Sequence, residues 1–240
     1  MTNKKKYELT ADVKLNVFGV KLFRIKALVS FGSIEAGELG GYIEKEENLK
    51  QSGDAWVSGN ARVYGDAWVS GDAWVYGNAE VYGNARVYGD AWVYGDAWVY
   101  GDARVYGNAE VYGDARVYGD AWVFGNAEVF GDAEVFGDAE VYGNARVSGD
   151  AEVYGNAEVS KKTHLLQIGF IGSRESIATF FRTKLNQISV SCGCFIGTVD
   201  EFETAVEHSH KGTKHEITYK LAIQLAKAQL ELEGEETQNA

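Results

Sequence analysis

The chain has 240 residues, of which 45% are hydrophobic and 24% charged, and it contains no proline. This composition is ample for a folded core and excludes a disordered or membrane-spanning chain. The formal net charge of −12 at pH 7 disfavours binding to nucleic acid or lipid headgroups and favours basic partners or cations.

The N-terminal sequence MTNKKKYELT is polar and has no apolar segment of the kind found in a secretory signal. Two cysteines alone do not indicate a secreted disulfide scaffold. We therefore expect a cytoplasmic protein.

Residues 1–52 are predicted to form a small N-terminal β cap. The alternation of apolar and polar residues from Tyr7 to Ile34 favours short strands over helix. The following segment, GELGGYIEKEENLKQSG, is placed to cover the open first coil of the region that comes next.

Residues 53–160 repeat the phrase G-[D/N]-A-x-V-[Y/F/S] eighteen times without insertion or deletion. Ala and Val are two residues apart, so in an extended segment they point to one side, while x and the last residue point to the other. Gly-Asp or Gly-Asn then allows a tight turn. A period of six over this length predicts a β-helix with an interior of Ala and Val and therefore without a cavity.

The inward Val57, the corner Asn60 and the inward Ala61, with their repeats, resemble the left-handed parallel β-helix of the hexapeptide-repeat family. In that family three phrases make one triangular coil, which implies six coils here. The phrase Gly40-Gly41-Tyr42-Ile43-Glu44, followed by Asn48-Leu49 and Gln51, is similar to the entry into the repeat in bacterial and phage proteins often labelled putative acetyltransferases. The resemblance implies an all-β solenoid.

All six tryptophans occupy the outward position x of the repeat, and three of them fall on one predicted face, since x recurs there every eighteen residues. Exposed aromatic patches usually mark interfaces, and the hexapeptide family commonly forms trimers. We therefore expect a homotrimer. The outward tyrosines are expected to stack as ladders between coils. The predicted binding residues are Trp56, Trp68, Trp74, Trp92, Trp98 and Trp122.

The repeat contains 11 Asp, 7 Glu, 5 Arg and no Lys, a net charge of −13. Stacked corner columns such as Asp96, Asp114, Asp132 and Asp150 either recruit cations such as calcium or stay solvated. Glutamates concentrate toward the C-terminal end of the repeat. The predicted acidic face consists of Glu128, Glu134, Glu140, Glu152 and Glu158.

Residues 161–240 are predicted to form a small α+β domain of three strands and two helices. Thr198 and Glu201 form a capping box that begins a helix of about ten residues. A second helix, roughly 215–233, has an apolar face that includes Ile217, Leu221 and Leu225. The segment Gly193–Thr198 with Glu201-Phe202 resembles a short module of phage-encoded proteins.

Many members of the hexapeptide family are acyl-CoA transferases that use a histidine as general base. The repeat has no histidine, because His164, His208, His210 and His215 all follow it. We therefore expect no catalytic residue, no cofactor and no enzymatic activity, with hexapeptide acetyltransferase as an alternative.

Cys192 and Cys194 with His208 and His210 are candidate zinc ligands, since thiolates and imidazoles suit a tetrahedral site. The two cysteines are alternatively buried residues on one face of a strand, or a redox pair.

The sequence favours a phage- or prophage-type scaffold that binds itself and a host or phage protein. The alternative is a stiff acidic rod that imitates nucleic acid and inhibits a host defence protein. Binding by such a mimic would weaken steeply with salt.

Overall fold

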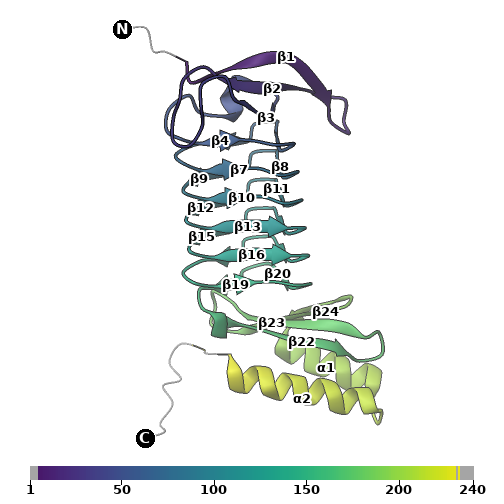
Figure 1. Ribbon diagram of the computed structural model, residues 1–240. Coiled ribbons are helices and arrows are strands. Elements are labelled where there is room, and N and C mark those ends of the chain that lie inside the picture. Colours follow the sequence, from purple (N-terminus) through teal and green to yellow (C-terminus); the bar gives the residue numbers. More distant parts are fainter. Residues whose placement is uncertain (1–4, 231, 233–240) are drawn as a thin grey trace, which may run out of the picture.

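The computed structural model describes residues 5–230 and 232. A long prism of stacked coils occupies the middle of the molecule, with an N-terminal cap at one end and a module of four strands and two helices at the other (Figure 1). The predicted all-β solenoid with β cap and C-terminal α+β region is confirmed.

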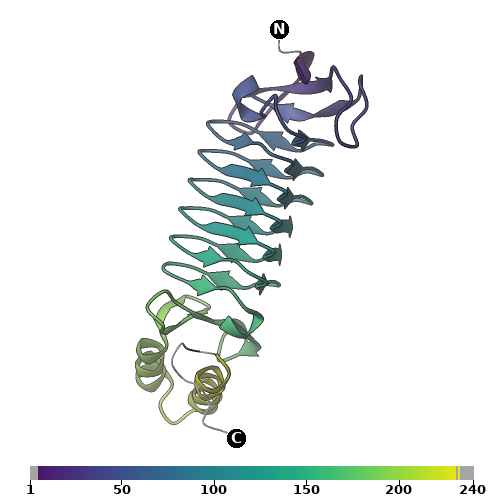
Figure 2. The same ribbon diagram turned by 90° about the vertical axis from the view of Figure 1, so that its left-hand side faces the viewer.

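The three sides of the prism are parallel sheets, which Figure 2 shows as stacked coils. On each side, a strand pairs with the strand eighteen residues later, as Val93 does with Val111, so three phrases make one coil. Sheet A contains β5 (Arg62–Val63), β8 (Glu80–Val81), β11 (Trp98–Val99), β14 (Arg116–Val117), β17 (Glu134–Val135) and β20 (Glu152–Val153). Sheet B contains β4 (Trp56–Val57), β7 (Trp74–Val75), β10 (Trp92–Val93), β13 (Glu110–Gly113), β16 (Glu128–Gly131) and β19 (Arg146–Val147). Sheet C contains β6 (Trp68–Val69), β9 (Arg86–Gly89), β12 (Arg104–Gly107), β15 (Trp122–Gly125), β18 (Glu140–Val141) and β21 (Glu158–Val159).

The Ala and Val of every phrase are buried, and together they form one continuous core. The corner glycines allow the turns that close this core. Gly101, for example, has φ +71°, and a Cβ built there would lie 3.0 Å from the backbone nitrogen of Gly119 in the next coil. Both the left-handed conformation and the close approach of neighbouring coils therefore require glycine.

The segment predicted to cover the first coil is instead part of the prism. β3 (Leu39–Ile43) pairs in parallel with β5, and Leu49, just after the 3₁₀ helix η1 (Glu46–Asn48), forms a parallel bridge to Val69. Residues 39–52 thus add an incomplete coil before the six that the repeat predicts. The prediction was wrong because this segment lacks the repeat motif while keeping inward aliphatic residues at Ile43 and Leu49.

The hairpin of β1 (Tyr7–Leu15) and β2 (Lys21–Ala27) provides the actual cover and extends sheet A through β3. The Tyr7 hydroxyl donates to the Leu49 carbonyl at 2.6 Å, and the Lys6 ammonium donates to the carbonyls of Gly53 and Ala55. The cap therefore pairs backbone groups that an open coil would leave exposed.

The C-terminal module is an antiparallel sheet with two helices. It contains β22 (Leu165–Ile171), β23 (Ser176–Arg182), β24 (Ile188–Cys192), β25 (Phe195–Thr198), α1 (Val199–His210) and α2 (Lys214–Gln229), after η2 (Lys162–His164). The prediction of three strands missed one, because Gly193-Cys194 turns the chain and divides one stretch into the antiparallel pair β24 and β25. The capping box of Thr198 and Glu201 is confirmed.

Strand β23 joins the two cores. Phe181 is buried in the core of the prism, whereas its neighbour Phe180 is buried in the core of the module. Side chains alternate between the two faces of a strand. The sheet of the module therefore covers the last coil.

The predicted apolar face of α2 does not face the module core. Ile217, Leu221 and Leu225 are exposed, whereas Tyr219 and Ile223 are buried. The helix is anchored by the smaller apolar face that contains Ala222 and Ala226. Among the residues that the structure describes, no helix is long and apolar enough to cross a membrane.

Candidate functional site

The tryptophan column of sheet B has the predicted register but not the predicted exposure. Trp56 pairs with Trp74 and Trp74 with Trp92. Trp56 is fully buried because the cap closes over it, with the rings of Tyr7 and Phe31 packed edge-on at 6.3 and 5.4 Å. The prediction that Trp56 is a binding residue is therefore wrong, since its outward position in the first coil lies under the cap.

Two tryptophans are exposed on adjacent sides of the prism, one before and one after the corner Gly95-Asp96. Trp92 on sheet B is 45% exposed and Trp98 on sheet A is 41% exposed. The corner residue Asp96 lies between them in the chain and is also exposed. We call these three residues the Trp92–Trp98 edge.

The remaining three outward tryptophans are half-buried. Trp74 packs against the prism core. Trp68 and Trp122 lie on sheet C, where the guanidinium of Arg86 lies 5.8 Å from the Trp68 ring and that of Arg104 lies 4.6 Å from the Trp122 ring. The six predicted binding residues therefore do not form one surface.

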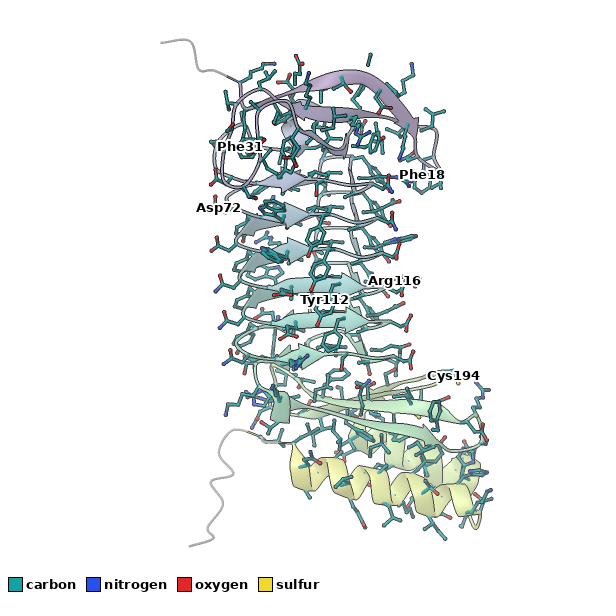
Figure 3. All side chains as sticks on the ribbon, in the orientation of Figure 1. Phe18, Phe31, Asp72, Tyr112, Arg116 and Cys194 are labelled. Carbon is teal, nitrogen blue, oxygen red and sulfur yellow. The ribbon has the colours of Figure 1, made fainter. Side chains whose placement is uncertain are left out.

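The tyrosine ladders are confirmed. Tyr94 and Tyr112 stack with ring centroids 4.9 Å apart, and Tyr112 stands in the column of rings in the middle of Figure 3. Similar ladders run along sheets A and C, with phenylalanine continuing them at Phe124 and Phe136. The outward aromatic rings thus bind successive coils to each other.

Ladder tyrosines also meet the outward residue of the next coil. Where that residue is glutamate, the hydroxyl donates to it, as Tyr118 does to Glu134 at 2.9 Å. The same glutamate forms an ion pair with Arg116, also at 2.9 Å. We call this arrangement an Arg-Tyr-Glu unit. It recurs with Arg62, Tyr64 and Glu80.

The five glutamates of the predicted acidic face lie on three different sides of the prism. Glu128 lies on sheet B, Glu134 and Glu152 on sheet A, and Glu140 and Glu158 on sheet C. All five have hydrogen-bond or ion-pair partners; Arg146, for example, lies 3.1 Å from Glu128. The prediction was wrong because a period of six places consecutive phrases on different sides of the prism.

Three of these glutamates hold the C-terminal module. Glu140 pairs with Lys184 at 2.8 Å, Glu158 pairs with Arg182 at 3.4 Å, and Glu152 accepts a short hydrogen bond from the Ser191 hydroxyl. The acidic end of the prism is therefore the seam to which the module is docked.

The corner aspartates carry the uncompensated charge of the prism. Of the eleven, Asp66 is the one that forms an ion pair among the described residues, with Lys45 at 2.7 Å. Others accept hydrogen bonds from corner amides, as Asp96 does from Asn78. Within the described part of the chain, no group of three or more His, Cys, Asp or Glu side chains could hold a metal ion.

The cysteines lie beside a pocket of about 320 Å³ in the C-terminal module, together with His210 and Tyr219. Cys192 is buried, whereas Cys194 is exposed in the turn after β24, so the prediction that both are core residues of one strand face is wrong. Burial raises the pKa of the Cys192 thiol, and the neighbouring Tyr219 hydroxyl partly opposes this shift. The turn at Gly193 separates the two thiols.

Two of the four histidines come together. The His210 ring lies 5.9 Å from His215 and 5.4 Å from Tyr219, whereas His208 is exposed on α1. His164 is buried at the end of the prism beside Ser160. None of the four histidines lies on an exposed side of the prism, where a general base for acyl transfer would be needed.

Sequence analysis missed a groove of about 360 Å³ over sheet C, lined in part by Arg86, Arg104 and Trp122. The available signal was the succession of two arginines at the outward position of one column, eighteen residues apart.

Comparison with known proteins supports the solenoid. The model of the YdcK β-solenoid repeat family matches residues 55–71, 79–95, 109–125 and 139–155. Comparison with curated proteins finds no match. All four matched segments lie within the prism, and in them the chain is similar to the YdcK β-solenoid repeat.

Proposed function

We propose that the protein is a non-enzymatic scaffold that binds proteins through the Trp92–Trp98 edge, and that it first binds copies of itself in a homotrimer. The supporting observation is the exposure of two large indoles, 45% and 41%, on a prism whose other outward tryptophans are half-buried or, at Trp56, fully buried. Exposed aromatic side chains on a rigid surface are typical anchors of protein interfaces. The cytoplasmic setting and the phage or prophage origin belong to the same proposal and rest on the sequence.

The interior supports a scaffold rather than an enzyme. Every Ala and Val of the repeat is buried, so the prism offers no internal cavity for a substrate. Acyl transfer would need a general base on the prism. The repeat contains no histidine, and His164 is buried at its end.

Sedimentation velocity tests the proposal. The wild type is expected to sediment as a trimer and the Trp92→Ser/Trp98→Ser variant as a monomer, because both anchors are lost. Val17→Ser/Phe18→Ser is the matched control, since these two residues are 86% and 74% exposed at the tip of the β1–β2 hairpin, outside the repeat. A wild-type protein that remains monomeric at high concentration, with water-quenched Trp92 and Trp98, would rule out the homotrimer.

The corner aspartates favour one second function, that of an acidic mimic of nucleic acid. Ten of the eleven have no ion pair among the described residues, and they form rows along the prism edges. Replacing Asp96, Asp114, Asp132 and Asp150 by Asn removes four charges and keeps the corner geometry, since Asn60 and Asn78 precede them in the same row. A mimic would bind basic proteins only at low salt and would lose them in this variant.

A further inference from the structure

We infer that the groove over sheet C is a binding site for one compact oxyanion, a phosphate monoester, held by the guanidiniums of Arg86 and Arg104. The groove measures about 360 Å³. It lies on another edge of the prism than the Trp92–Trp98 edge, so this inference does not rest on the proposed docking function.

These two arginines differ from the other arginines of the prism. Arg62, Arg116 and Arg146 each form an ion pair with a glutamate of their own sheet, at 2.7, 2.9 and 3.1 Å. Within the described part of the chain, no carboxylate oxygen lies within 4.0 Å of the Arg86 or Arg104 guanidinium, so neither forms an ion pair. The sheet C groove therefore contains two guanidiniums without a fixed counter-charge.

The two arginines are also neighbours in the sheet. Arg86 and Arg104 are directly paired across β9 and β12. Like charges on directly opposite residues of neighbouring strands destabilise a sheet. The Arg-Tyr-Glu unit is incomplete on this part of sheet C. Arg104 occupies the position that Glu80 and Glu134 occupy in the two complete units.

Indoles at both ends of the pair hold the guanidiniums. Arg86 lies over Trp68 at 5.8 Å and Arg104 over Trp122 at 4.6 Å. A guanidinium that stacks on an aromatic face still presents its N–H groups along its edges. Arg86 and Arg104 start from neighbouring strands, and arginine binds phosphate oxygens bidentately, so a phosphate in the groove can be contacted from both.

The surroundings limit the size of the anion. Asp102, Asp120 and Asp138 line the same groove. Lys184, at its C-terminal end, is engaged by Glu140 at 2.8 Å and by the carbonyl of Asp138 at 2.9 Å. The unpaired positive charge of the groove is therefore confined to Arg86 and Arg104, and the neighbouring carboxylates repel a polyanion such as nucleic acid.

The repeat itself supplies the decisive variant. Arg104→Glu would rebuild an Arg-Tyr-Glu unit, because Arg86 and Tyr88 then stand to Glu at 104 as Arg62 and Tyr64 stand to Glu80. This variant should be at least as stable as the wild type while losing the anion site. Arg86→Gln tests the second guanidinium with a neutral side chain, and Arg116→Gln is the control at a paired arginine outside the groove.

Titration with inorganic phosphate, followed by calorimetry and by the midpoint of thermal unfolding in phosphate-free buffer, tests the site. We expect saturable binding to the wild type and to Arg116→Gln, and about tenfold or greater loss in Arg104→Glu and Arg86→Gln, since each removes a charge-assisted contact. Sulfate should compete with phosphate. If acetate binds as tightly as phosphate, the site prefers a carboxylate ligand, and the assignment to a phosphate monoester is overturned.

Two further results would overturn the inference. One is the absence of saturable phosphate or sulfate binding to the wild type. The other is an equal phosphate response in the wild type and Arg104→Glu, which would show binding elsewhere. The stability of Arg104→Glu without phosphate separates a genuine loss of binding from a failure of this variant to fold.

Discussion

The Tyr118 hydroxyl donates to Glu134 at 2.9 Å, one coil further along the same face of the prism. The two residues are sixteen apart in the sequence, and their side chains meet because a coil contains eighteen residues and the ladder position follows the outward position by two. This diagonal contact adds a polar bond between coils to the backbone bonds and the stacked rings.

Tyr118→Phe should lower the free energy of unfolding by about 1 kcal/mol, because it removes a partly exposed hydrogen bond to a carboxylate and keeps the stacked ring. Tyr100→Phe is the matched control, since Tyr100 belongs to the same ladder and the next outward residue is Arg116 instead of glutamate. Denaturant unfolding checks both variants. Equal losses would show that the hydroxyl–glutamate bond contributes nothing measurable.

Gly101→Ala should be more destabilising than Gly155→Ala by at least about 1 kcal/mol. Both glycines have positive φ, +71° and +60°, so both variants experience backbone strain. Only the Cβ at 101 would also lie 3.0 Å from the Gly119 nitrogen, whereas nothing lies within 4 Å of a Cβ at 155. Thermal unfolding of the two variants isolates the cost of close coil spacing. Equal losses would contradict this explanation.

Trp56→Ala should cost about 3–5 kcal/mol, as expected for a fully buried aromatic residue. Trp92→Ala should cost less than about 1 kcal/mol, because Trp92 is 45% exposed. Denaturant unfolding of both variants compares the two positions. A small effect of Trp56→Ala would mean that the cap does not pack over the first coil.

Alkaline pH should destabilise the prism between about pH 10 and 12. Burial raises the pKa of Tyr82 to about 12, and burial with the neighbouring glutamate raises the pKa of Tyr94 and Tyr118. Because the unfolded phenol ionises near its ordinary value of 10.0, the folded state retains protons that the unfolded state loses in this window. The stabilisation is therefore complete below pH 10 and is lost as pH rises toward 12.

Phenolate absorbance and circular dichroism followed together check this pH dependence. The tyrosines should ionise as the β signal is lost, and Tyr82→Phe should reduce the steepness of the loss. Ionisation of the ladder near pH 10 with the fold intact would contradict the prediction.

The sequence determined the prism because the repeat has a strict period. Ala and Val two residues apart, with Gly and Asp or Asn at each corner, permit one arrangement of strands and turns, and the structure places Val93 and Val111 in register accordingly. The tyrosine ladders and the alignment of Trp56, Trp74 and Trp92 follow from the same period.

Only the tertiary structure decided what covers each outward residue, because exposure depends on segments far away in the chain. The loop that contains Phe31 buries Trp56 and leaves Trp92 in solvent. Lys184 forms an ion pair with Glu140, so this part of the predicted acidic face lies in the contact between the prism and the C-terminal module. Arg86 and Arg104 differ from the paired arginines only through the residues that neighbouring coils place beside them. A local period fixes which side of a strand a residue occupies, whereas its partners are set by the stacking of coils and by the two caps.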